Sequence, residues 1–500
     1  MSTEATHTQQ QEGARFTRDA DADAGAGRRH TPASILARLD RIDVWSLPFL
    51  FIGILGTGFL FTFYDIFDIN VSFIQSCVAL KPGCTPETAL DALKVPVVLN
   101  LAGYVVGTLA LSPLADRYGR RNMLMVTMAL TGLGSLYNAL APDYTQFVIA
   151  RVITGFGIGA DLAIVNTFIG EVAPRRSRAQ FTSLIFIMSA IGAVLGIWLG
   201  LFLTTPAEPW PHGLPFAQAG PGFETGWRWM YALGAVLALV AIALRFELPE
   251  SPRWLVGQGR LDEADRVVAD MEATAAKHGP LREPDAEVPV EAHEGGRTMP
   301  FRELFSNPTY VRRILLLVTV WFVGYVTVYG FAAGFTSILT ALGYAPPEAG
   351  LIVAVGAVGF IGCATISAVW GDRLNRKMWL PLAAAVTFAG GVIIAAGGDD
   401  RTIAFLGAFV IFLGFNLWVP ATYARSAENF PSRARTTGFG LVDGIGHLGG
   451  GIGVLVIAPL VPKMSTFGAL SLVSGFLIVA AVIGQFGIET RNKRFEDVSP

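Results

Sequence analysis

Few charged side chains lie inside the long apolar stretches of this 500-residue chain, and two aspartates and one arginine stand out. Asp65 and Asp68 are three residues apart, so they share one face of a helix. Arg151 lies at a similar depth in another apolar stretch that runs in the opposite direction. A carboxylate beside a guanidinium stays ionised, and it can take up a proton once the guanidinium moves away. We expect these three residues to bind and release a proton. The alternative is a static ion pair between two helices, with Asp68 facing water.

Four further ionisable residues could contribute to a binding site within the membrane. Asp161 follows a glycine-rich run, and we expect it to bind a proton or substrate, or else to be a buried carboxyl satisfied by hydroxyl groups. Asp443 and His447 are four residues apart on one helix face, and a protonated histidine can bind an anion near neutral pH. The alternative is a neutral His447 bonded to Asp443. Arg425 is either an anion-binding group or part of a gate at its helix end.

Aromatic side chains form a second candidate set for substrate binding. Tyr325 and Tyr329 are spaced to share a helix face, and Asn416 and Trp418 could oppose them from another helix. Aromatic residues at this spacing also serve in packing, so both interpretations remain open. Together with Asp161, Arg425 and His447, these residues predict a cavity better suited to a small anion than to a hexose.

The composition indicates that these residues are positioned by a chain dissolved in lipid. Hydrophobic residues make up 52% of the sequence and charged residues 15%, with a mean hydropathy of +0.50. Soluble proteins carry about 25% charged residues. The sequence pI near 6.3 gives no basic excess for nucleic acid. No Walker, GxSxG or HExxH sequence and no metal-ligand spacing occurs, so we expect no enzyme, no cofactor and no metal.

Twelve apolar stretches are long enough to cross a bilayer, which takes about 20 residues each. We expect a tail at 1–45, a six-helix bundle at 46–248, a linker at 249–312, a second six-helix bundle at 313–488 and a tail at 489–500. Arg and Lys are concentrated in the loops on the side of both tails, which places the termini in the cytoplasm. On the other side, Cys77 and Cys84 could form a disulfide or remain two thiols.

Two charged motifs recur in the same order in both halves. The sequence Asp-Arg-x-x-Arg begins at Asp116 and again at Asp372, and Glu-x-x-Pro-x-x-x-Arg begins at Glu171 and again at Glu428. The repeats are offset by 256 or 257 residues. A duplicated six-helix unit predicts an all-α membrane protein with two bundles related by a pseudo-two-fold axis and a site between them.

The repeated motifs also predict a gate at the cytoplasmic side. We expect one network in each half, which closes the inner side when the cavity opens outward. The alternative is that these residues only anchor loops. The predicted gate residues are Asp116, Arg120, Glu171 and Arg178 in the first half and Asp372, Arg376, Glu428 and Arg435 in the second.

Several motifs resemble the major facilitator superfamily, in particular its sugar-porter-type and metabolite:proton symporter branch. They are the loop motif from Asp116 to Arg121, the run Arg151-x-x-x-Gly155-x-Gly157-x-Gly159, and Pro249-Glu250-Ser251-Pro252-Arg253. The resemblance implies alternating access, with the aspartate after Tyr64 carrying a coupled proton and the arginine that opens the glycine motif as its partner. Asp65 and Arg151 stand at those positions.

The sequence as a whole predicts a secondary active transporter in the cell membrane that couples protons to a small organic metabolite, an anionic one, and works as a monomer. The glutamine pair by which sugar porters recognise hexoses is absent from the stretch around Tyr325. The alternatives are a sugar or polyol porter, by proton symport or facilitated diffusion, then a phosphate:proton symporter, and a non-transporting nutrient sensor.

Overall fold

The computed structural model describes residues 31–500 except 175–176, 221, 285–299, 333, 343, 399, 432–433, 458–459, 494 and 499–500. Residues 1–30 of the predicted N-terminal tail, part of the predicted linker and the last two residues therefore lie outside the described residues.

The described part of the chain contains twelve helices long and apolar enough to cross a membrane, as predicted. The first six are α3 (Phe49–Leu80), α4 (Pro86–Tyr118), α5 (Arg120–Leu140), α6 (Tyr144–Val172), α7 (Arg178–Thr204) and α8 (Gly226–Arg245). The second six are α12 (Pro308–Ala332), α14 (Pro346–Trp370), α15 (Trp379–Gly397), the two-part span α16 (Arg401–Gly414) and α17 (Val419–Glu428), α18 (Arg435–Ile457) and α19 (Thr466–Gly484). The predicted all-α fold is confirmed. The second set begins at Pro308, somewhat before the predicted residue 313.

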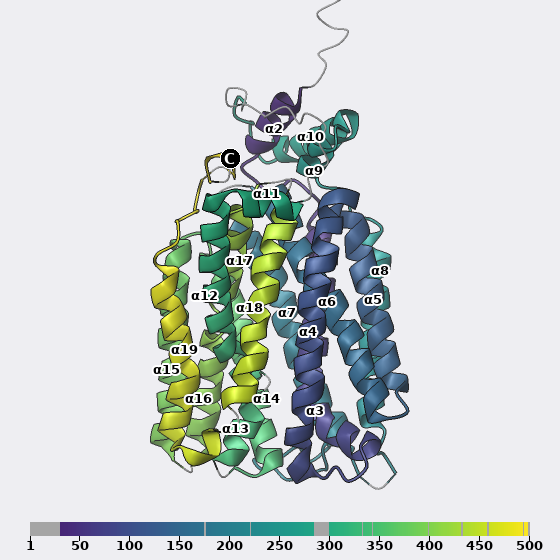
Figure 1. Ribbon diagram of the computed structural model, residues 1–500, viewed down its shortest axis with the longest axis vertical. Helices are drawn as coiled ribbons and strands as arrows, with labels where there is room; N and C mark the ends of the chain where they lie inside the picture. The colour runs from purple at the N-terminus through teal and green to yellow at the C-terminus, as the bar shows by residue number, and fades with distance from the viewer. Residues whose placement is uncertain are drawn as a thin grey trace, which may run out of the picture.

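The two sets of helices form two bundles that stand side by side (Figure 1). At the boundary between them, α7 packs against α14 and α4 packs against α18. Short helices α13 (Phe335–Ala341), η1 (Arg376–Met378) and η3 (Val461–Lys463) connect spans of the second bundle. A site between the bundles therefore takes its walls from both halves of the chain.

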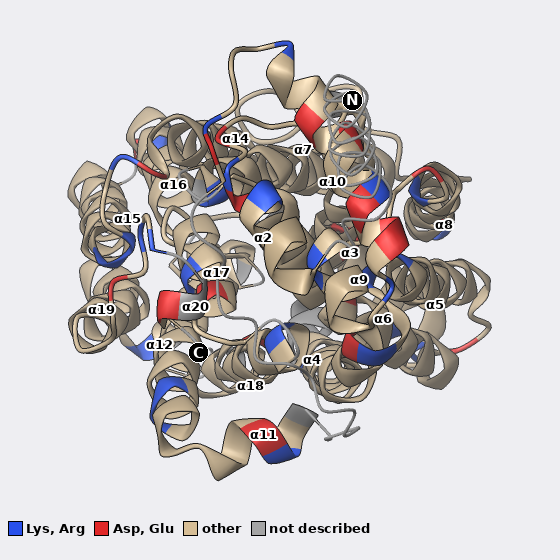
Figure 2. Ribbon diagram, turned by 90° about the horizontal axis from the view of Figure 1, so that it is seen from above, with Lys and Arg blue, Asp and Glu red and all other residues tan. Residues whose placement is uncertain are grey.

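One end of the molecule, here called the α2 end, carries further short helices outside the spans (top of Figure 1; α20 is labelled in Figure 2). They are α2 (Pro32–Asp40), α9 (Pro252–Gly257), α10 (Leu261–Ala276), α11 (Pro300–Ser306) and α20 (Phe495–Val498). Arg38 of α2 pairs with Glu272 of α10 at 2.7 Å, and Arg253 of α9 pairs with Asp40. Figure 2 looks onto this end and shows charged residues on its short helices and loops. Helix α2 is thus tied to the connection between the bundles.

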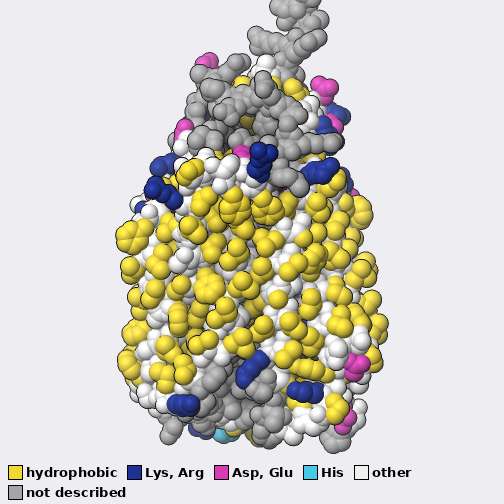
Figure 3. Space-filling model, viewed as in Figure 1, with side chains coloured by type: hydrophobic (Ala, Val, Ile, Leu, Met, Phe, Trp, Pro, Cys, Tyr) yellow, Lys and Arg dark blue, Asp and Glu magenta, His cyan; other side chains and the backbone are white. Residues whose placement is uncertain are grey.

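The middle of the molecule presents hydrophobic side chains outward. Figure 3 shows them across the length of the spans, with Lys and Arg mostly near the two ends. Leu239 of α8, for example, is 67% exposed. An apolar surface of this extent on helices that satisfy their own backbone hydrogen bonds is what a lipid environment requires.

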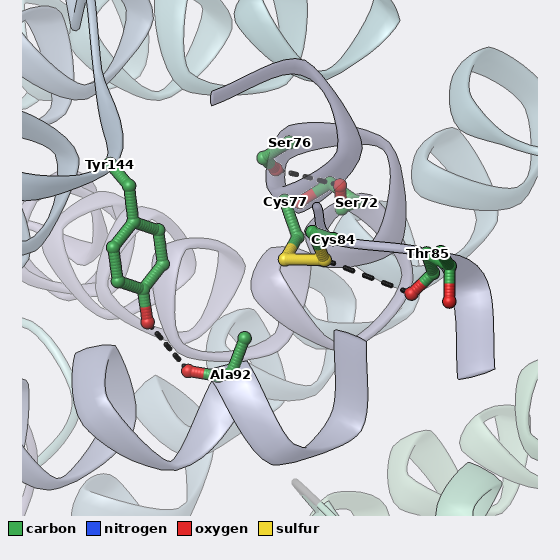
Figure 4. The surroundings of a disulfide bond; sticks show 7 residues. All are labelled: Ser72, Ser76, Cys77, Cys84, Thr85, Ala92 and Tyr144. Carbon is green, nitrogen blue, oxygen red and sulfur yellow. Dashed lines mark hydrogen bonds between the residues drawn. A yellow bond between two sulfur atoms is a disulfide. The ribbon is translucent and has the colours of Figure 1, made fainter. Parts of the chain in front are cut away.

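The opposite end, here called the disulfide end, carries a bond between Cys77 and Cys84. Cys77 lies in the last turn of α3 and Cys84 in the loop that leads to α4 (Figure 4). In the same view, Tyr144 at the start of α6 donates to the backbone oxygen of Ala92 in α4 at 2.6 Å. Of the two states open for these cysteines, the structure has the disulfide.

Glycines let α4 and α6 approach each other closely. A Cβ atom at Gly155 would lie 2.0 Å from the backbone oxygen of Asn100, and one at Gly107 would lie 1.9 Å from that of Phe156. At this crossing the Asn100 amide donates to the backbone oxygen of Arg151 at 2.6 Å. The glycine motif of α6 is therefore a helix-packing device that fixes the position of Arg151.

Candidate functional site

Asp65, Asp68 and Arg151 form a buried cluster between α3 and α6. Nη1 of Arg151 lies 2.9 Å from Oδ2 of Asp65 and 3.9 Å from Oδ1 of Asp68. Nη2 of Arg151 also donates to the backbone oxygen of Asp65 at 3.1 Å. All three side chains are at most 2% exposed. The contact expected between Asp65 and Arg151 is present, and Asp68 lies beside it and away from water.

This cluster contains two carboxyl groups and one guanidinium. Among the described residues, neither carboxyl oxygen of Asp68 accepts a hydrogen bond. An uncompensated charge is costly to bury, so a cluster with two acids and one base favours holding one proton. The arrangement can therefore store a proton and release it when the surroundings change.

A cavity lies between the two bundles and is lined by both. Its walls are mainly aromatic and apolar, with one amide and one imidazole. The lining residues are Phe63, Ile66 and Phe67 of α3, Leu162 of α6, Tyr325, Val328, Tyr329 and Ala332 of α12, Asn416, Val419 and Tyr423 in and after the break between α16 and α17, and His447 of α18. Phe63, Ile66 and Phe67 lie on a different face of α3 from Asp65 and Asp68, so the acid cluster adjoins the cavity without lining it.

Asp443 and His447 stand at the centre of a ring of tyrosines. Asp443 accepts hydrogen bonds from Tyr104 at 2.5 Å and from Tyr325 at 3.1 Å. The ring of His447 stacks on Tyr104 with centroids 3.9 Å apart and lies 4.0 Å from the Tyr325 ring. Tyr104 comes from α4 in the first half, and sequence reasoning missed it. This group therefore joins the two bundles beside the cavity.

The tenth span is broken beside the cavity. α16 ends at Gly414 and α17 begins at Val419, and Asn416 lies in the break. Trp418 is fully buried and packs 4.7 Å from Trp321, while its ring occupies the space left by Gly324. Asn416 therefore lines the cavity as expected, whereas Trp418 supports its wall from behind. Broken spans of this kind place irregular backbone where it borders a cavity.

Asp161 does not face the cavity, which its neighbour Leu162 lines. Asp161 is paired with Arg245 of α8, with Nη1 to Oδ1 at 2.5 Å and Nη2 to Oδ2 at 3.0 Å. The hydroxyl of Thr127 donates to the same carboxylate at 2.8 Å. Sequence reasoning missed Arg245 because an arginine at the end of a span is usually placed in the interface with water.

Arg425 lies neither in the cavity nor in an ion pair of the described residues. Its guanidinium donates to the backbone oxygens of Gly484 at 3.1 Å and Ile488 at 3.1 Å, where α19 ends. It therefore satisfies carbonyl groups that a helix end leaves without partners. Both expected roles, anion binding and the gate, lack support from this position.

Each repeated motif builds an ion-pair network at the α2 end. In the first half Arg120 lies 2.9 Å from Asp116 and 3.1 Å from Glu171. In the second half Arg376 lies 2.7 Å from Asp372 and 3.4 Å from Glu428. The matching geometry reflects the internal repeat.

The remaining two arginines cross between the halves, contrary to the expectation that each would stay in its own half. Arg435 of α18 lies 3.3 Å from Glu171, and Arg178 of α7 lies 3.9 Å from Glu428. The hydroxyl of Thr437 also donates to Asp116 across the boundary at 2.7 Å. Arg178 is 3% exposed and Arg435 0%, so little water reaches these crossing contacts. The α2 end is thus held closed by reciprocal contacts between the bundles.

Two further acid–hydroxyl pairs complete the networks. Ser251 donates to Glu171 at 2.5 Å, and Thr490 donates to Glu428 at 2.5 Å. The preceding residue in each case, Glu250 or Glu489, accepts backbone N–H groups. Glu250-Ser251 belongs to a motif noted in the sequence, whereas its counterpart Glu489-Thr490, just after the sixth span of the second half, is the signal that sequence reasoning overlooked.

Glu250 and Glu489, which cap the helices that begin at Arg120 and Arg376, differ in the direction of their pKa shifts. Burial raises the pKa of Glu250 above its ordinary range. Burial alone would raise the pKa of Glu489 as well, but N–H groups of Arg491, Lys377 and Arg376 hold it below its ordinary range.

The family model described as "Sugar (and other) transporter" matches residues 50–500. The chain belongs to this family. It is therefore a multi-pass membrane protein and a secondary transporter of the sugar-porter type in the major facilitator superfamily, and it is not an enzyme.

Similar transporters of the family include proteins named for different cargoes. The niacin transporter NiaP of Acinetobacter baylyi is 25% identical over 93% of this chain and 99% of its own length. The 4-hydroxybenzoate transporter PcaK of Pseudomonas aeruginosa is 29% identical over 76% of this chain and 81% of its own. The solved proton:xylose symporter XylE, bound to 6-bromo-6-deoxy-D-glucose, has a TM-score of 0.70 at 20% identity and covers 90% of this chain and 98% of its own. At that identity the last similarity shows the fold.

Proposed function

We propose that this protein is a proton symporter that carries a small organic anion across the cell membrane by alternating access. The observation that carries the proposal is the buried cluster of Asp65, Asp68 and Arg151, which has one more acid than base. A proton gradient can drive transport if the proton on this cluster is taken from one side and released to the other.

The closed α2 end supports alternating access. Its crossing contacts, Arg435 with Glu171 and Arg178 with Glu428, would have to break before the cavity opens on this side. We place this end in the cytoplasm because Arg and Lys concentrate in its loops. The disulfide at the opposite end fits an oxidising exterior. The two halves of one chain both line the cavity, and we propose that the protein works as a monomer.

An aromatic monocarboxylate is the substrate class that the cavity supports best. Tyr325, Tyr329 and Tyr423 offer ring faces, and His447 and Asn416 offer polar contacts. Niacin and 4-hydroxybenzoate, named for two of the relatives, are both aromatic rings with one carboxyl group. Because Asp161 and Arg425 lie elsewhere, recognition of an anion depends on His447 and Asn416.

The decisive test is Asp65→Asn in proteoliposomes with an imposed pH gradient, using nicotinate and 4-hydroxybenzoate as cargo. We expect the variant to lose accumulation against a gradient and to retain exchange, because the amide cannot take up the coupled proton. Asp143→Asn is a matched control, since Asp143 caps the exposed start of α6 and asparagine caps equally well. Unchanged accumulation by Asp65→Asn would refute the proposed coupling.

A further inference from the structure

The hydrogen bond of His447 determines which ring nitrogen remains free for a ligand. Nδ1 of His447 lies 2.8 Å from the backbone oxygen of Asp443. A backbone carbonyl only accepts, so Nδ1 carries a hydrogen atom. Nε2 makes no hydrogen bond to any described residue, although the side chain is only 3% exposed and lines the cavity. The nitrogen available to a ligand is therefore Nε2.

This tautomer makes anion binding depend on a proton. In the neutral ring Nε2 is an acceptor, which repels a carboxylate oxygen. In the protonated ring Nε2 becomes a charged donor, and charge-assisted hydrogen bonds to carboxylates are among the strongest in proteins. A carboxylate can therefore bind at Nε2 well only when the ring holds two protons.

The surroundings suit an imidazolium that forms only when a ligand arrives. Oδ1 of Asp443 lies 3.6 Å from Nδ1 and provides the single nearby negative charge among the described residues that pack here. The neighbouring helices present titratable hydroxyls, namely Tyr104 from α4, Tyr325 and Tyr329 from α12 and Tyr423 from α17. α6 presents Leu162, while its Asp161 is bonded to Arg245. The histidine thus has one acid partner and no neighbouring Arg or Lys in this set.

We propose that His447 takes up one proton at Nε2 when the carboxylate of the substrate binds, so that Asp443 and His447 form a second proton site in the cavity wall. This inference rests on the proposed transport of an aromatic monocarboxylate. The proton leaves a hydronium ion or water molecule of the solution and forms the Nε2–H bond, and no bond between heavy atoms changes. The substrate carboxylate then accepts a hydrogen bond from Nε2 of the imidazolium, while the aromatic ring of the substrate packs among the tyrosines.

Asn416 completes the binding position. Its amide is 3% exposed, lines the same cavity and makes no side-chain hydrogen bond to a described residue. It can donate to the second carboxylate oxygen. The next helix, α17, begins at Val419 on the same cavity, so its positive end also faces the anion.

The test measures binding to the purified full-length protein as a function of pH. The probes are nicotinate, 4-hydroxybenzoate and benzoate, with nicotinamide and benzamide as neutral analogues. From about pH 5.5 to about pH 8.5, which spans the ordinary range of imidazole, we expect carboxylate affinity to fall by up to about tenfold per pH unit. Affinity for the amides should stay constant.

Variants assign the proton to a residue. His447→Gln should abolish the pH dependence of carboxylate binding, whereas His212→Gln, at an exposed histidine, should keep it. Asp65→Asn should keep it as well, which separates this site from the coupling cluster. Persistence of the slope in His447→Gln, or failure of every carboxylate to bind the unmodified protein, would overturn the inference.

A direct proton count makes the test independent of whether His447→Gln folds. In weakly buffered solution with a pH indicator, Asp65→Asn should take up about one proton per bound nicotinate on the alkaline side of the imidazole range. No uptake would overturn the second site. If Asp65→Asn loses gradient-driven accumulation but still takes up a proton with nicotinate, both the coupling role of Asp65 and the second proton site at His447 are supported. If Asp65→Asn still accumulates substrate, only the coupling role of Asp65 is refuted.

Discussion

Neutralising Asp161 or Arg245 singly should destabilise the protein far more than neutralising both. Their two-pronged contact is fully buried, and each is 0% exposed. Asp161→Asn leaves the guanidinium of Arg245 without a counter-charge, and Arg245→Gln leaves the carboxylate of Asp161 in the same state. Removing one partner of a buried pair costs about 3–5 kcal/mol.

The double variant Asp161→Asn/Arg245→Gln should recover most of that loss. Two neutral amides can bond to each other, and replacing a buried pair by neutral groups is often close to neutral in stability. As a control of scale, Thr127→Val removes only the hydroxyl that donates to Asp161 and should cost about 1 kcal/mol.

Thermal unfolding of the purified variants gives the order of stability, and proteoliposome transport gives their coupling. We expect both single variants to unfold well below the unmodified protein and the double variant close to it, with proton-driven accumulation retained. If the double variant is as unstable as the two losses combined, the pair is not the source of the effect. If it is stable but uncoupled, Asp161 carries a proton after all.

Two further predictions concern helix caps and helix packing. The pKa of Glu489 is lowered in the folded protein, so its carboxylate stabilises the fold above the ordinary carboxyl range. This stabilisation is lost as the pH falls below about 4. Glu489→Gln should therefore destabilise the protein at neutral pH but not in acid. The pKa of Glu250 is raised, so its ionised form stabilises the fold less at neutral pH than its protonated form does in acid. Glu250→Gln should therefore lower the free energy of unfolding less at neutral pH than in acid. Equal losses for either variant at all pH values would contradict this. Gly155→Ala should cost about 1–3 kcal/mol by overpacking, because the added Cβ would lie 2.0 Å from a backbone oxygen. Gly170→Ala in the same helix, with its nearest neighbour at 3.9 Å, should leave thermal unfolding unchanged, and similar losses for both would refute the packing argument.

The helices and the two-bundle fold were predictable because membrane thickness fixes how long an apolar stretch must be. The internal repeat then assigned six spans to each half. The contact between Asp65 and Arg151 was also predictable, since two groups at one depth on neighbouring helices can meet. Spacing also showed that Asp65 and Asp68 share a face.

The rotation of each helix about its axis was not predictable. Spacing tells which residues share a face, but not which face meets the cavity, and so Asp161 was expected in the cavity where Leu162 stands. The contacts of Arg425 with the end of α19 depend on the same rotation. The exchange of Arg178 and Arg435 between halves depends on how the bundles dock, and a repeat fixes the order of motifs only within each half.

The reciprocal ion pairs at the α2 end, Glu171 with Arg435 and Glu428 with Arg178, join the two bundles at two matching points. Each bundle contributes one acid and one arginine, so neither bundle can move away from the other while one of the two ion pairs remains. Release must hydrate four buried charged groups together, and water arriving there solvates what the partner gives up. These ion pairs are therefore strong while water is excluded and weak once it enters, so hydration of the α2 end is part of its opening.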